Sequence, residues 1–161
     1  MSINLKKILS VTATAAVMTL IFMFSAQTSE ESSQVSTGLT QKIVDVVAAV
    51  TAMSPDEKAG LVLNIHNIIR KAAHFTIYGL LGVCSGAMFR SFMSNVKFGR
   101  IILYAAAFCC VYACTDEIHQ HFVSGRGPQI TDVLIDTCGA LCGAALLAGL
   151  SYVVGRRKNY D

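Results

Sequence analysis

Ionisable and polar side chains recur at helical spacing inside stretches of the sequence that are otherwise apolar. Arg70, His74 and Tyr78 are spaced i, i+4 and i+8, so one stripe of a helix would carry a cation, an imidazole and a phenol. Ionisable groups are costly within a membrane, and they persist there when they pair, face a bundle interior or serve a function. Arginine suits the binding of anions, and imidazole suits proton transfer.

Two further stretches supply carboxylates. In the first, polar side chains occupy two adjoining stripes of one helix: Asp116, Glu117, His119, Gln120 and His121. The other stretch begins with Asp132 and Asp136, which are one helical turn apart. A carboxylate beside an imidazole can supply a general acid and a general base, so Asp116, Glu117 and His119 are candidate catalytic residues.

Long apolar runs would position these side chains. Of the 161 residues, 53% are apolar and only 14% are charged, which is unusual for a soluble domain. A helix needs roughly 20 apolar residues to cross the hydrocarbon of a bilayer. The runs of about that length are residues 8–24, 72–89, 101–120 and 133–155. The sequence therefore predicts an all-α membrane protein, a bundle of four transmembrane helices that forms a single domain over residues 1–161.

The positive charges predict the orientation of these spans, because short loops rich in lysine and arginine stay in the cytoplasm. The cations fall in three segments: before the first run, between the second and third runs, and at the end of the fourth. A four-span protein places these three segments on one side of the membrane. The cations are Lys6, Lys7, Arg90, Lys97, Arg100, Arg156, Arg157 and Lys158. We therefore expect both termini in the cytoplasm and residues 25–71 and 119–131 outside. The first run is interpreted as a retained span, because Phe24 stands where a signal-peptide cleavage site needs a small residue.

The first outer segment predicts two amphipathic helices between spans one and two. Apolar residues recur at helical spacing from Val35 to Val50. A second helix is expected to begin at Ser54, where Ser-Pro-Asp-Glu combines a capping box with proline at the first helical position. These helices would pack at the membrane surface or on the bundle, and the alternative is that they form a lid over a site.

All four spans would deliver polar groups to one outer layer. The stripe that begins at Asp132 continues through Gly139 and Gly143, a small-xxx-small pattern that lets a neighbouring helix approach closely. The turn at residues 124–128 would project Arg126 into the same layer. The candidate site residues are Ser25, Gln27, Arg70, Lys71, His74, Tyr78, Asp116, Glu117, His119, Gln120, Arg126, Asp132 and Asp136.

We expect no cofactor. The six cysteines fall within or near the spans, where buried thiols behave as small apolar side chains, and no CxxC spacing indicates zinc or redox chemistry. The less favoured alternative is a zinc or manganese ion held by His74, His119 and one of Asp116, Asp132 or Asp136, without a compact signature such as HExxH. The net charge of +3 is explained by cytoplasmic loops, so nucleic-acid binding is not expected.

Several of these motifs also resemble those of a known protein family. FSAQTSEES at residues 24–32, RKAAHFTIYGLLG at residues 70–82, and DEIHQHFVSGR with DVLIDTCGALCG at residues 116–143 resemble successive motifs of the VanZ-like family. One departure is Ser124, where that family often has proline. The family comprises small bacterial membrane proteins named after one that accompanies glycopeptide resistance, notably to teicoplanin. The resemblance implies a multi-pass protein of the bacterial cytoplasmic membrane that acts at the cell envelope.

Functions of different classes remain open at this stage. In the first, the outer layer binds an anionic lipid-linked ligand, a cell-wall precursor or a lipoglycopeptide antibiotic, with Arg70, Lys71 and Arg126 holding phosphate. In the second, the chain is an intramembrane enzyme, a phosphoryl or acyl hydrolase or transferase that uses the Asp116, Glu117 and His119 cluster.

Two further interpretations compete with these. A proton-coupled carrier draws on the same carboxylates, but four spans would then need a homo-oligomer to enclose a path through the lipid bilayer. In a purely structural network, Arg70 would pair with Asp132 or Asp136 only to hold the bundle together. The variety of the polar groups favours a functional site over such a network.

Overall fold

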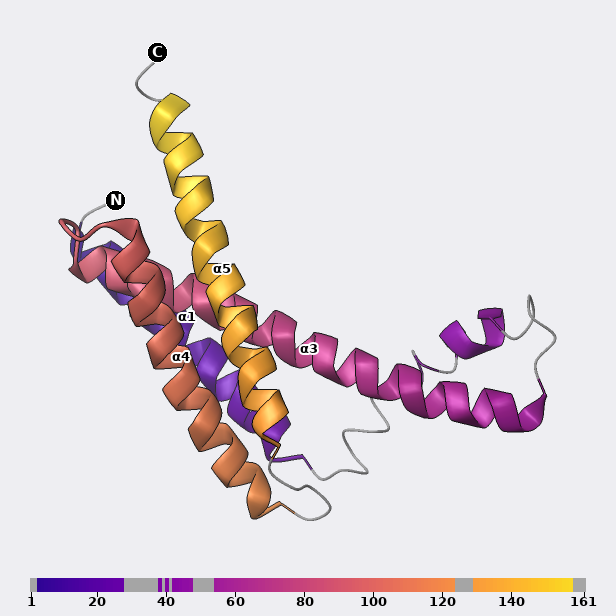
Figure 1. Cartoon of the computed structure of the whole chain (residues 1–161). Coiled ribbons are helices and arrows are strands. Elements are labelled where there is room, and N and C mark those ends of the chain that lie inside the picture. Colours follow the sequence, from indigo (N-terminus) through magenta and orange to yellow (C-terminus); the bar gives the residue numbers. More distant parts are fainter. Residues whose placement is uncertain are drawn as a thin grey trace.

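The computed structural model describes residues 3–27, 38, 40, 42–47, 54–123 and 129–157, and within these residues it contains four long helices and no strand. They are α1 (Ile3–Ser25), α3 (Pro55–Phe92), α4 (Phe98–His121) and α5 (Ile130–Arg157) (Figure 1). Each contains a segment long and apolar enough to cross a membrane: Ile3–Ser25, Gly60–Phe92, Phe98–His121 and Ile130–Val154. The predicted all-α, four-span architecture is therefore confirmed.

Helix α3 is longer than the sequence analysis predicted. The helix expected from Ser54 and the span expected at residues 72–89 are one continuous helix of 38 residues, about 57 Å long at the rise of an α-helix. No proline or glycine interrupts residues 61–78, and Arg70 and Lys71 are good helix formers, so nothing ends the helix between the two parts. Its first half projects away from the other long helices (Figure 1).

The start of α3 has the predicted cap. The Ser54 backbone N–H and hydroxyl both donate to Glu57 Oε2, at 2.8 Å each, and the Glu57 N–H donates to the Ser54 hydroxyl at 3.4 Å. These donors lower the pKa of the Glu57 carboxyl below its usual value. Of the other amphipathic helix, predicted between Val35 and Val50, the structure describes residues 38, 40 and 42–47, and these are helical.

The crossing of α3 and α5 forms the centre of the bundle. A Cβ atom added at Gly139 would meet the backbone of Phe75, and one added at Gly143 would meet the backbone of Gly79. Likewise, a Cβ at Gly82 would meet the backbone of Ala140. Because these glycines have no side chain, the backbones of α3 and α5 come into direct contact. This confirms the close approach predicted from the small-xxx-small pattern.

The exterior of the bundle is apolar, as expected for helices in lipid. Leu103, Val111, Ile118, Leu134 and Leu146 are each at least 59% exposed. The six cysteines are free thiols, and they are only partly buried as a group: Cys109 is inside, whereas Cys114, Cys138 and Cys142 face outward. An exposed apolar surface of this extent is unusual for a soluble monomer.

Candidate functional site

Four buried carboxylates gather at one end of the bundle, where α1 and α4 end and α5 begins. They belong to Asp116, Glu117, Asp132 and Asp136, and each residue is at most 6% exposed. We call this end the polar end. Burial of a carboxylate is costly unless it is paired or hydrogen-bonded, so the partners of these four groups determine what the site can bind.

Two cationic or titratable side chains of α3 pair with the aspartates of α5. Arg70 Nη2 lies 2.6 Å from Asp132 Oδ2, and one turn further along, His74 Nδ1 lies 3.5 Å from Asp136 Oδ1. The second distance is long for a hydrogen bond, so His74 and Asp136 face each other without a tight contact. On each helix the two paired residues are four positions apart. The contacts of Gly139 and Gly143 with the α3 backbone, further along α5, set the register in which these pairs meet.

The carboxylates of α4 have different partners. Asp116 Oδ2 accepts a hydrogen bond from Gln120 Nε2 at 3.1 Å. Glu117 Oε2 accepts one from the backbone N–H of Gln129 at 2.8 Å, which links α4 to the start of α5. Within the described residues, neither carboxylate lies at ion-pair distance from an arginine or lysine. They remain free to pair with a cationic or hydrogen-bond-donating group.

Other polar atoms near these carboxylates are buried without a hydrogen-bond partner in the described part of the chain. They include the hydroxyls of Ser25 and Tyr78 and the Nδ1 atom of His119. The His119 ring packs against Phe22 of α1, with ring centroids 4.7 Å apart. Tyr78 lies beside Tyr112, whose hydroxyl donates to the Met18 carbonyl of α1 at 2.6 Å. Buried polar groups are normally hydrogen-bonded, so these atoms are free to contact a further polar group.

The comparison with known protein families agrees with this architecture. A family model described as VanZ/LLP1 matches residues 10–152, which cover most of the first and last spans, all of the other two, and the polar end. The chain belongs to the VanZ/LLP1 family. Together with the four apolar helices, this membership makes it a multi-pass membrane protein. A search of the curated proteins and a search of the solved structures each returned no match.

The structure of this VanZ/LLP1 protein brings most of the predicted site residues together. Those at the polar end in buried or half-buried positions are Ser25, Gln27, Arg70, His74, Tyr78, Asp116, Glu117, His119, Gln120, Asp132 and Asp136. Lys71 is on the same turn of α3 but is exposed to the exterior. Arg126 and its turn at residues 124–128 lie outside the described residues.

Two residues near this site were not predicted from the sequence. His66 lies one turn before Arg70 on the same stripe of α3, and its Nε2 atom is buried without a partner in the described residues. The same i, i+4 spacing that identified His74 would have found it. Gln129 acts through its backbone N–H, which side-chain patterns do not reveal.

The charges of the polar end are predominantly negative. Among its described residues, the polar end holds four buried carboxylates and one guanidinium, that of Arg70, which pairs with Asp132, while His74 faces Asp136. No three histidine, cysteine or acidic side chains of the described residues are arranged to hold a metal ion. This VanZ/LLP1 site therefore combines one strong anion-binding group with several hydrogen-bond acceptors.

Proposed function

We propose that this protein acts at the bacterial cell envelope by binding an anionic lipid-linked ligand, and that this binding contributes to tolerance of glycopeptide or lipoglycopeptide antibiotics such as teicoplanin. The polar end would face outward from the cytoplasmic membrane, with both termini in the cytoplasm. The cations of α1, of the end of α3 and of the start of α4 lie toward the other end, which is the side favoured for the cytoplasm. The ligand would be a lipid-linked cell-wall precursor or the antibiotic itself.

The observation that carries this proposal is the position of Arg70. Its side chain is 27% exposed, while that of its partner Asp132 is 3% exposed. A guanidinium has five N–H donors, and in the described part of the chain Arg70 uses one of them, in the bond to Asp132, so donors remain for the oxygens of a phosphate. The exposed Lys71 would add to the attraction of an anion. Arg126, which lies outside the described residues, is proposed from the sequence to contribute a further cation.

The carboxylates would recognise the rest of the headgroup. Asp116 accepts a hydrogen bond from the Gln120 amide, and Glu117 accepts one from the Gln129 backbone N–H, so the donors are neutral groups. Carboxylate oxygens accept further bonds from hydroxyl, amide or ammonium groups, all of which occur in sugars and peptides. A phosphate at Arg70 and a sugar or peptide at the acidic residues would therefore use both parts of the site.

Binding by purified protein in nanodiscs tests the proposal, with a polyprenyl diphosphate, a lipid-linked cell-wall precursor and teicoplanin as probes. Arg70→Gln and Arg126→Gln should each weaken binding, whereas Lys97→Gln, a loss of the same charge at the other end, should not. The same variants in a deletion strain should change antibiotic susceptibility at equal membrane level. Unchanged binding of all three probes in Arg70→Gln would overturn the proposed function.

A second candidate function is an intramembrane phosphoryl or acyl hydrolase or transferase. It is favoured by the carboxylates of Asp116 and Glu117, which lack a cation partner among the described residues, and by the unpartnered Nδ1 atom of His119 on the same helix. Such groups would move protons during the reaction. Incubation with the lipid-linked probes should then yield a product by mass spectrometry, and Glu117→Gln should stop turnover while binding persists. Binding without product would exclude this candidate for those probes.

A further inference from the structure

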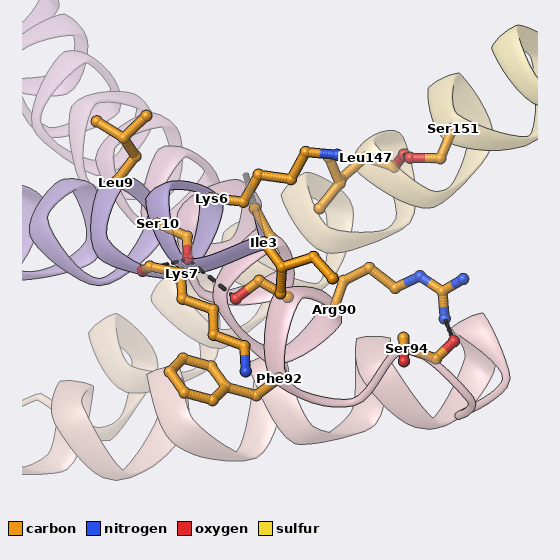
Figure 2. A pocket seen from close by; sticks show the side chains of 12 residues that line it. Ile3, Lys6, Lys7, Leu9, Ser10, Arg90, Phe92, Ser94, Leu147 and Ser151 are labelled. Carbon is orange, nitrogen blue, oxygen red and sulfur yellow. Dashed lines mark hydrogen bonds between the residues drawn. The ribbon is translucent and has the colours of Figure 1, made fainter. Parts of the chain in front are cut away.

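A separate pocket lies at the opposite end of the bundle, between the start of α1, the end of α3 and the second half of α5. It is a cavity of about 680 Å³ lined by the cations Lys6, Lys7 and Arg90 (Figure 2). In the sequence, these residues indicate only the orientation of the spans. The folded chain brings them around one space, although they come from two helices that are far apart in sequence.

Two of the cations of this basic pocket, Lys7 and Arg90, are held in place by uncharged neighbours. Arg90 Nη1 donates to the carbonyls of Ser94 and Val96, at 2.6 and 3.0 Å, and its guanidinium lies 4.7 Å from the centre of the Phe98 ring. Lys7 Nζ lies 5.1 Å from the centre of the Phe92 ring. These contacts position positive charge without neutralising it.

No carboxylate compensates these charges in the described part of the chain. The ion pairs of the described residues are those of Arg70 and His74 with the aspartates of α5, and both belong to the polar end. Two lysines and one arginine around a single cavity form a concentration of positive charge that would attract an anion. The first half of α1 and the end of α3 also meet here through the hydroxyls of Ser10 and Ser91, whose oxygens are 3.2 Å apart.

Part of the wall of the basic pocket is apolar. Ile3 and Leu9 of α1 line it and are 71% and 49% exposed, and Leu147 of α5 lines it from the other side. The pocket also lies where the membrane-crossing segments of α1 begin and those of α3 and α5 approach their ends. This is the level of the phospholipid headgroups, with hydrocarbon directly beside it.

We propose that the basic pocket binds the phosphate headgroup of an anionic phospholipid, whose acyl chains lie against Ile3, Leu9 and Leu147. Basic pockets between transmembrane helices are suited to anionic headgroups, because the cations bind the phosphate while the chains stay in the hydrocarbon. A soluble phosphate ester would satisfy the same cations, but it would make no use of the apolar walls. The site is independent of the polar end and of the ligand proposed there.

Native mass spectrometry of the full-length protein in a neutral detergent tests this proposal. The probes are dioctanoyl phosphatidylglycerol, dioctanoyl phosphatidylcholine and glycerol 3-phosphate. We expect one phosphatidylglycerol to bind in preference to the other two. Replacing both lysines, as Lys6→Gln with Lys7→Gln, should weaken its binding about 30-fold, because each cation near a headgroup contributes about 1 kcal/mol.

A matched variant separates the pocket from general surface charge. Lys97→Gln with Arg100→Gln removes the same charge at the same end but from residues outside the pocket lining, and it should change the affinity less than about twofold. Equal losses in the two double variants would overturn the proposal. Equal binding of glycerol 3-phosphate and phosphatidylglycerol would overturn the assignment to a lipid.

A second variant tests the cavity without changing its charge. Ser151 of α5 lines the pocket and is exposed, so Ser151→Phe should fold and should fill part of the space. Phosphatidylglycerol affinity should then fall at least fivefold, because the headgroup and the phenyl ring compete for volume. Unchanged affinity would place the lipid outside this cavity and overturn the proposal.

Discussion

The ion pair between Arg70 and Asp132 should respond asymmetrically to the loss of either partner. The Asp132 side chain is 3% exposed, whereas that of Arg70 is 27% exposed. In Arg70→Gln the carboxylate stays buried without its cation, and breaking a buried pair in this way costs about 3 kcal/mol or more. In Asp132→Asn the guanidinium can still reach water or headgroups, so the loss should be about 1 kcal/mol.

Thermal unfolding of the purified variants in one detergent measures this difference. For a chain of this size, a loss of about 1 kcal/mol lowers Tm by roughly 2–4 °C, so Arg70→Gln should unfold roughly 6–12 °C below wild type and Asp132→Asn roughly 2–4 °C below. The double variant should recover part of the loss, because no unpaired charge remains. Equal losses in the single variants, or strictly additive losses in the double, would refute this account of the pair.

Ligand binding by the same variants separates a functional role of Arg70 from a structural one. Asp132→Asn frees the guanidinium, so it should bind a polyprenyl diphosphate at least as tightly as the wild type. Arg70→Gln should bind it about tenfold more weakly or worse, because a hydrogen bond to a charged group contributes about 1.5–3 kcal/mol. If binding instead follows Tm in both variants, the pair holds the bundle together and does not bind the ligand.

Three further predictions concern the fold and its orientation. Gly139→Ala should destabilise the protein by about 1–3 kcal/mol, because its Cβ would meet the Phe75 backbone. Gly149→Ala is the control: it has open space around it and should be neutral or slightly stabilising. Equal Tm values for the two variants would contradict this prediction. Ser54→Ala should speed amide hydrogen exchange in the first turn of α3, through the loss of about 1 kcal/mol of capping, and unchanged exchange there would show that the cap is dispensable. Green fluorescent protein fused to the C-terminus should fluoresce, and alkaline phosphatase fused there should be inactive, because the C-terminus is expected in the cytoplasm. The reverse pattern would place the polar end in the cytoplasm.

The spans and the polar stripes could be predicted because both depend on local spacing. Apolar runs of sufficient length identify the spans, and i, i+4 spacing places Arg70 and His74 on one face wherever the helix goes. The continuity of α3 was missed because a change from amphipathic to apolar composition suggested two helices, whereas only proline or glycine would have interrupted the backbone between them. The cap at Ser54 was predictable, since its partner Glu57 is three residues away.

The pairings across helices could not be predicted in the same way. Asp132 and Asp136 were equivalent candidates for Arg70, and the choice between them depends on the register at which α3 and α5 cross. That register follows from backbone contact at Gly139 and Gly143, which is a property of the packed pair of helices. The basic pocket depends in the same way on where three helices meet, so its cations appeared in the sequence only as an orientation signal.

The distribution of charge at the two ends restricts the ligands that each can bind. At the polar end, an anion approaching Arg70 also approaches the buried carboxylates of α4 and α5, which repel it. A bare diphosphate headgroup would therefore bind there less tightly than one that also carries hydroxyl, amide or ammonium donors for Asp116 and Glu117. The basic pocket has no such acidic neighbours among the described residues, so a simple phosphate headgroup suffices there. Competition between the two ligands should accordingly be absent, because the α3–α5 glycine crossing lies between their sites.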